Sequence, residues 1–207
     1  MSAHAQQERQ ALADLLADVG PDAPTLCAGW RTGDLAAHLV VRERRPDAAP
    51  GLVVPALAGY LDRVQRSVRD GRSWQALVDT VRTGPPLLLR PLDEPVNTVE
   101  YFVHHEDVRR AAPEWEPRAL PEGMERALWS RLRLLGRMAA RKAGVGLVLE
   151  APGHGRLTVR AGEPSATVTG APGELVLFLF GRKGAARVAL TGDEAAVAKV
   201  RGADFGL

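Results

Sequence analysis

Hydrophobic positions in the first two thirds of the chain recur at the three- and four-residue spacing of an α-helix. Over residues 4–18, Leu12, Leu15 and Leu16 fall on one side, and Gly20-Pro21 follows them. This pattern predicts an amphipathic helix that stops before Gly20. By the same reasoning, further helices are expected at about 32–45, 54–69, 74–82, 98–111 and 122–142.

Particular residues mark the ends of two of these helices. Thr32 is predicted to cap the second helix, with Asp34 in its positively polarised first turn, and Pro46 ends it. Asn97 or Thr98 is predicted to cap the fifth. Between the fourth and fifth helices, residues 84–95 are rich in proline and are expected to form an irregular connection.

The pattern changes at Gly144, where short apolar runs separated by glycine and proline replace the helical spacing. We expect strands at 145–150, 156–160, 166–169 and 188–190, and helices at 172–180 and 194–201. Pro172 suits the first position of the former helix, and Gly181 suits its C-terminal cap. The sequence therefore predicts an α+β protein with a helical domain, residues 1–143, and a small mixed α/β domain, residues 144–207.

Composition narrows the functional classes. The 27 Lys and Arg residues nearly balance the 25 Asp and Glu residues, which argues against a nucleic-acid-binding protein. Cys27 is the single cysteine, so an internal disulfide and a cysteine-based zinc cluster are excluded, and a reducing cytoplasmic setting is expected. Residues 1–10 lack a leader pattern, and no segment approaches the roughly 20 apolar residues of a membrane span, so no membrane association is expected.

Glu100 and His104 are the best candidates for chemistry. Four residues apart on a helix, they project from one face, where they can grip one cation. His38 lies on the inward-facing stripe of the second predicted helix and is the best third ligand. Two histidines and one glutamate suit a Zn²⁺-type ion and leave one coordination position open. Asp107 can orient a histidine or take a ligand position. From spacing alone, an exposed ion pair or a hydrogen-bonded core histidine would also explain this pair.

Five other residues have alternative interpretations. His105 is predicted to be an outer or surface residue, and His154 an exposed residue of a hairpin. Cys27 is interpreted as small packing rather than a nucleophile near the metal, and Trp30 as core rather than a wall of the site. Arg182 is, with Asp107, a weak catalytic candidate, because it can donate to a substrate carboxylate; the alternative is a solvated surface arginine.

The motifs around these residues resemble a known family. The runs Cys27-Ala-Gly-Trp30, Asp34-Leu-Ala-Ala-His38-Leu and Glu100-Tyr-Phe-Val-His104-His-Glu-Asp107-Val are similar to the mycothiol-dependent maleylpyruvate isomerase family, in the wider DinB-like group of metalloenzymes. The resemblance implies an N-terminal four-helix bundle, here with extra helices. It also implies a divalent metal, usually zinc, held by His38, Glu100 and His104.

The resemblance extends to the C-terminal part of the chain. The stretch from Val168-Thr-Gly170 to Leu177-Phe-Leu-Phe-Gly181-Arg182, continuing into Leu190-Thr-Gly192-Asp193, resembles the family's small domain, which is akin to sterol carrier proteins. The doubled His104-His105 and the neighbouring Arg109-Arg110 indicate a subfamily distinct from the isomerase itself.

The function implied by the resemblance is that of a metal- and thiol-dependent isomerase or transferase. A low-molecular-weight thiol, with mycothiol as the candidate co-substrate, would occupy the open metal position, lose its proton there and attack a small electrophilic substrate. The alternatives are a metal-hydroxide hydrolase and a non-catalytic binding module braced by the metal. The sequence leaves the substrate, the native metal and the oligomeric state open.

Overall fold

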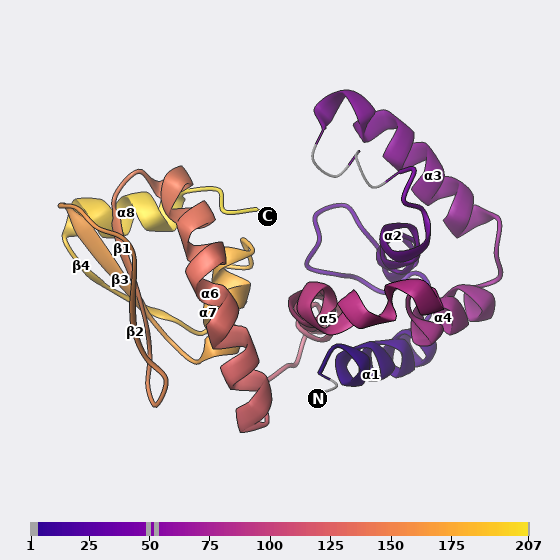
Figure 1. The fold of residues 1–207 in the computed structure, drawn as a ribbon, viewed down its shortest axis with the longest axis horizontal. Coiled ribbons are helices and arrows are strands. Elements are labelled where there is room, and N and C mark those ends of the chain that lie inside the picture. The colour runs from indigo at the N-terminus through magenta and orange to yellow at the C-terminus, as the bar shows by residue number, and fades with distance from the viewer. Residues whose placement is uncertain (1–3, 49–50, 52–53, 207) are drawn as a thin grey trace. The chain divides into compact units, whose positions relative to one another are not determined.

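The computed structural model describes residues 4–48, 51 and 54–206, and the chain divides into two compact units, residues 1–116 and 117–207. The described residues form eight α-helices and one four-stranded sheet (Figure 1). The predicted α+β class is therefore confirmed.

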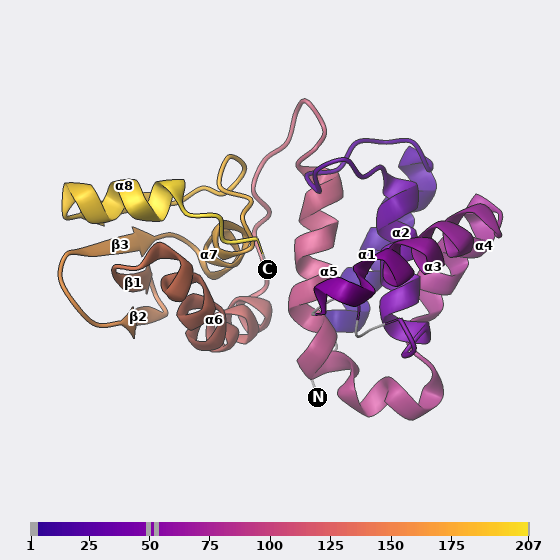
Figure 2. The same ribbon diagram turned by 90° about the horizontal axis from the view of Figure 1, so that it is seen from above.

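The described elements of the first unit are helices, and an isolated β-bridge joins Pro24 to Arg31. The helices are α1 (His4–Val19), α2 (Thr32–Arg44), α3 (Ala58–Asp70), α4 (Trp74–Thr83) and α5 (Asp93–Arg109), with two short 3₁₀ helices, η2 (Pro55–Leu57) and η3 (Leu87–Leu92). Helix α1 packs against α4 and α5, and α2 packs against α3 and α4 (Figure 1, Figure 2). Their apolar stripes meet in one core, whose members include Leu12, Leu16, Leu35, Leu39, Leu77, Val78 and Tyr101.

Helix α5 begins earlier than predicted. It starts at Asp93, so the caps expected at Asn97 or Thr98 are wrong, and η3 fills much of the connection that precedes it. Pro95 is tolerated because the N–H groups of a helix's first turn have no acceptor within the helix. Asp93 and Glu94 stabilise the positive end of the helix dipole there.

Helix α2 begins one residue earlier than a Thr32 cap would place it. Thr32 is the first helical residue, and Arg31 holds the capping position. The backbone N–H of Arg31 donates to the Asp34 carboxylate over 3.0 Å. The capping prediction for Thr32 is therefore wrong, whereas Asp34 lies in the first turn as predicted.

The second unit contains α6 (Glu122–Ala143), β1 (Gly146–Ala151), β2 (Gly155–Arg160), β3 (Ser165–Thr169), α7 (Pro172–Leu179), β4 (Ala189–Gly192) and α8 (Glu194–Gly202). The strand order is β2-β1-β3-β4; β1 and β3 are parallel, and the other two pairs are antiparallel. Helix α6 packs on α7, β1 and β2, and α8 packs on β3 and β4.

The division between the two units falls earlier than the boundary predicted near Gly144, because α6 packs on the sheet. Its small residues Gly136, Ala139 and Ala140 are buried. A Cβ atom at Gly136 would lie only 2.6 Å from a methyl carbon of Val159, so glycine permits the close approach. The change of pattern at Gly144 coincides with the change from α6 to β1, and the predicted domains, residues 1–143 and 144–207, stay a prediction.

Candidate metal centre

The structure brings the three predicted ligands together. His38 projects from α2, and Glu100 and His104 project from α5. The Nε2 atoms of both histidines lie 3.2 Å from the same oxygen, Oε1 of Glu100. The ring centroids are 5.3 Å apart and the rings are nearly perpendicular. The three donor atoms thus lie within 4.8 Å of one another, as ligands of one ion would.

The carboxylate of Glu100 is held in its charged form. Burial opposes its ionisation, but hydrogen bonds with His104 and His38 outweigh that penalty and hold the pKa of Glu100 well below its ordinary value. The guanidinium of Arg42 adds a positive charge, with its Nε atom 3.3 Å from the same Glu100 oxygen. An ionised carboxylate is the form that binds a cation.

Asp107 forms a hydrogen bond with Nδ1 of His104, the ring nitrogen that faces away from Glu100. The Nδ1 atom of His104 lies 2.9 Å from Oδ2 of Asp107, whose side chain is completely buried. Burial opposes the charged imidazole, but hydrogen bonds with Asp107, Cys27 and Glu100 raise the pKa of His104 well above its ordinary value. For an ion bound at Nε2 of His104, the structure favours the interpretation in which Asp107 orients the histidine through Nδ1 rather than binding that ion itself.

His38 has a different environment. Its Nδ1 atom lies 3.1 Å from the amide nitrogen of Gln65 on α3, and the Trp30 ring is 5.1 Å away. Burial lowers the pKa of His38 despite the opposing hydrogen bond with Glu100, so the ring is neutral near pH 7. Trp30 packs against the core and also flanks His38, so the two interpretations of this residue both apply.

Sequence reasoning missed Gln65. It lies four residues after Leu61 and three before Val68, on the buried stripe of α3. A glutamine at such a position is a signal that could have drawn attention to it, because a polar group on an inward-facing stripe needs a partner. Gln65 also borders a cavity of about 360 Å³ that is lined by Trp30, Asp62 and Arg66 among others.

Two histidine predictions are wrong. His105 was expected on the surface but is only 6% exposed, and its Nδ1 atom lies 2.8 Å from a carboxylate oxygen of Glu8. The reason is that α1 packs along α5 and covers that side of the helix. His154 is partly buried rather than exposed, because its ring lies beside Trp129 and its Nε2 atom is 3.1 Å from the Glu125 carboxylate.

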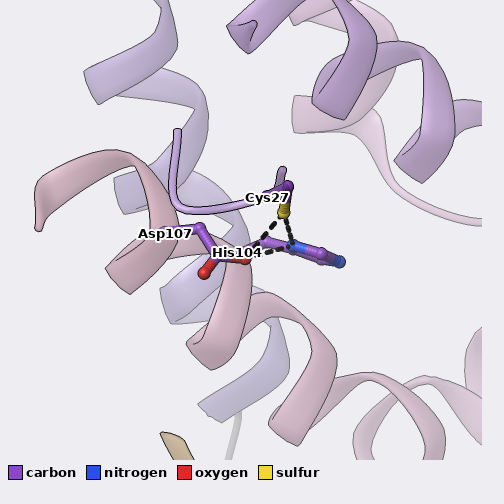
Figure 3. A group of neighbouring side chains, drawn as sticks. All are labelled: Cys27, His104 and Asp107. Carbon is purple, nitrogen blue, oxygen red and sulfur yellow. Dashed lines mark hydrogen bonds and ion pairs between the residues drawn. The ribbon is translucent and has the colours of Figure 1, made fainter. Parts of the chain in front are cut away.

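Cys27 is more than a packing residue. It packs against the core of the first unit, as predicted, but its thiol also donates to Oδ2 of Asp107 over 3.1 Å (Figure 3). Its sulfur lies 3.9 Å from Nδ1 of His104. Arg182, the other weak candidate, follows α7 in the second unit, and its guanidinium donates to the carbonyl oxygen of Phe180 over 2.6 Å. Its catalytic role stays a prediction.

The comparisons with known proteins agree with the predicted resemblance. Residues 132–199 match the family model described as the MDMPI C-terminal domain. A crystal structure of the mycothiol-dependent maleylpyruvate isomerase has the same fold, with a TM-score of 0.62 and 18% identity over 92% of this chain and 91% of that one. A variant of that enzyme with one histidine replaced by alanine covers the same shares at the same identity, with a TM-score of 0.55.

The class of fold is thus that of the mycothiol-dependent maleylpyruvate isomerase. The low identity agrees with the prediction of a chain distinct from the isomerase itself. No curated protein matches the chain significantly. Among the described residues, no helix has the length and apolar character needed to cross a bilayer.

Proposed function

We propose that His38, Glu100 and His104 bind one divalent cation, most simply Zn²⁺, at the active centre of a thiol-dependent isomerase or transferase. The observation that carries the proposal is the meeting of both Nε2 atoms at one Glu100 oxygen, each at 3.2 Å. Ligands of a tetrahedral ion with bonds of about 2.0–2.1 Å lie about 3.3 Å apart. Two imidazoles and one carboxylate form a donor set of catalytic zinc sites, which keep one position open.

The second nitrogen of His104 supports this arrangement, and that of His38 fits it after one change. Asp107 accepts the Nδ1 proton of His104, which leaves the Nε2 lone pair for the cation. At His38 the Gln65 amide nitrogen faces Nδ1, so the proton lies on Nε2. Turning the amide of Gln65 presents its oxygen instead and moves the proton to Nδ1, and the adjoining cavity gives the amide room to turn.

The thiol is proposed by analogy with the enzyme of the same fold, which its description calls mycothiol-dependent. A divalent cation lowers the pKa of a thiol coordinated to it, which supplies a nucleophile near neutral pH. On the protein side, His104 and His38 keep Glu100 ionised by hydrogen bonding, and Arg42 adds a fixed positive charge beside the centre. The substrate is a small electrophile, and the isomerase and transferase reactions share the addition of the thiol to it.

Elemental analysis tests the cation site. Purified Cys27→Ser protein, which lacks the thiol beside His104, should contain one equivalent of metal. The additional substitution His38→Ala or Glu100→Gln should remove this metal while the circular dichroism is unchanged. His154→Ala is the matched control, because its partners Glu125 and Trp129 belong to the second unit. Unchanged metal content in both site variants rejects the proposal.

The thiol is tested separately, in Cys27→Ser protein loaded with Co²⁺. Because Cys27 is the single cysteine, a thiolate-to-cobalt band in this variant arises only from an added thiol. Mycothiol should produce the band, and the additional Glu100→Gln substitution should remove it. Conversion of maleylpyruvate is the first reaction to assay. Turnover that is identical without thiol rejects the thiol and leaves the cation site standing.

A further inference from the structure

The Nδ1 side of His104 carries a second group of possible metal ligands. Cys27, His104 and Asp107 converge there, and their donor atoms lie within 4.8 Å of one another (Figure 3). We propose that Cys27 Sγ, His104 Nδ1 and Asp107 Oδ2 form a second cation position, selective for thiophilic divalent cations such as Zn²⁺ and Cd²⁺. It is distinct from the position at Nε2, although both use the same imidazole.

The distances suit such an ion. Oδ2 of Asp107 lies 3.1 Å from the Cys27 sulfur and 2.9 Å from Nδ1 of His104, and the sulfur lies 3.9 Å from Nδ1. A tetrahedral zinc with a sulfur bond of about 2.3 Å and two shorter bonds of about 2.0–2.1 Å separates its ligands by about 3.3–3.5 Å. Each distance therefore needs to change by only about half an ångström.

The loop that carries the thiol is fixed against α5. The N–H of Leu26 donates to the backbone carbonyl of Asp107 over 3.0 Å, so the residue beside Cys27 is tied to the turn that bears the carboxylate. Within the loop, the Cys27 N–H donates to the Thr25 hydroxyl and the Trp30 N–H donates to the Cys27 carbonyl. The sulfur is thereby positioned in advance of any ligand, which lowers the entropic cost of binding.

The burial and the chemistry of the group define what it accepts. Asp107 is 0% and His104 is 8% exposed, whereas Cys27 is only partly buried, so a fourth ligand can approach from its side. A thiolate with an imidazole favours zinc-like cations over Mg²⁺ or Ca²⁺, which prefer oxygen ligands. On binding, the thiol proton and the Nδ1 proton pass to solvent as the sulfur–metal and nitrogen–metal bonds form.

The two positions are coupled because they share one ring. Filling the second takes away the Nδ1 proton that Asp107 accepts, and filling both leaves His104 without either ring proton. We therefore expect the second position to bind more weakly when the first is full and more tightly when His38 is replaced.

Titration with Co²⁺ in buffer free of thiols tests the proposal. The single cysteine makes the assignment simple, because a thiolate-to-cobalt charge-transfer band in the near ultraviolet can arise only from Cys27. The band should appear in wild-type protein, form at lower Co²⁺ in His38→Ala, weaken in Asp107→Asn and vanish in Cys27→Ser. Circular dichroism controls for folding, and the hydroxyl of serine keeps a hydrogen bond to Asp107 available.

Three results would overturn the inference. The first is no band in wild-type protein at saturating Co²⁺. The second is loss of the band in His38→Ala, which would mean that the sulfur joins the Nε2 position. The third is a band that falls on dilution, which would mean a thiolate shared between molecules. Because the expected band persists in His38→Ala, failure of the proposed catalytic centre and failure of this position are distinguishable.

Discussion

Replacing Asp107 by asparagine tests how far a buried carboxylate strengthens cation binding at His104. Asparagine has nearly the same size and can still accept the Nδ1 proton, so the substitution removes the charge and keeps the shape. A hydrogen bond to a charged group is worth about 1.5–3 kcal/mol, and a neutral one about 0.5–1.5 kcal/mol. The midpoints of these ranges differ by about 1.3 kcal/mol, which predicts cation binding nearly tenfold weaker, at the low end of the effect of such outer partners.

The size of this loss should depend on pH. Asp107 also raises the pKa of His104 in the metal-free protein, so the wild-type cation competes with a proton below that raised pKa. In the Asp107→Asn variant the pKa of His104 is lower, so a proton competes less with the cation for this histidine. The affinity deficit is therefore partly hidden at neutral pH and fully visible at alkaline pH, where His104 is deprotonated in both proteins.

Competition with a chromophoric chelator is measured in Cys27→Ser protein, so that the cation binds at the Nε2 position. It gives the dissociation constants with and without the Asp107→Asn substitution at neutral and at alkaline pH. Gln65→Ala is the comparison, because it removes a neutral partner from His38, whose pKa is lowered rather than raised. Cation binding in Gln65→Ala should be about twofold to tenfold weaker than in the parent protein, and this deficit should be nearly independent of pH. An Asp107→Asn deficit that is absent at alkaline pH, or that shrinks as the pH rises, would refute the reasoning.

Three further predictions concern stability. Because the pKa of His104 is raised, its ion pairs stabilise the metal-free protein fully below the ordinary imidazole pKa. Denaturant unfolding should show that this stabilisation is lost as the pH rises through the raised pKa. In His104→Gln, the free energy of unfolding should depend less on pH in this range. Gly136→Ala should destabilise by about 1–3 kcal/mol in urea titrations, because its methyl meets Val159, whereas Gly59→Ala, which meets nothing within 4 Å, should not destabilise. Arg9→Met should cost about 3–5 kcal/mol, because it leaves the buried Glu43 without its ion-pair partner. Adding Glu43→Leu should recover stability in the same titrations, and no recovery would contradict this explanation.

The sequence by itself determined the elements of the fold and the central part of the candidate site. Helix and strand patterns depend on local spacing, so most of them were recognisable along the chain. The pairing of Glu100 with His104 was equally accessible, because residues four apart share a helix face. His38 was accessible as a third ligand because it lies on an inward-facing stripe, and the family resemblance supported its meeting with the other two.

Only the tertiary structure decided which side chains complete the site and where the units divide. Gln65 reaches His38 from another helix, and the Cys27 sulfur reaches Asp107 across 80 positions of sequence. Helix α1 buries His105. Helix α6 packs on the sheet because Gly136 allows it to approach Val159 closely. Each of these features depends on a contact between elements that are distant in the sequence. A local sequence pattern indicates which face of a helix or strand is apolar, but it does not indicate which other element covers that face.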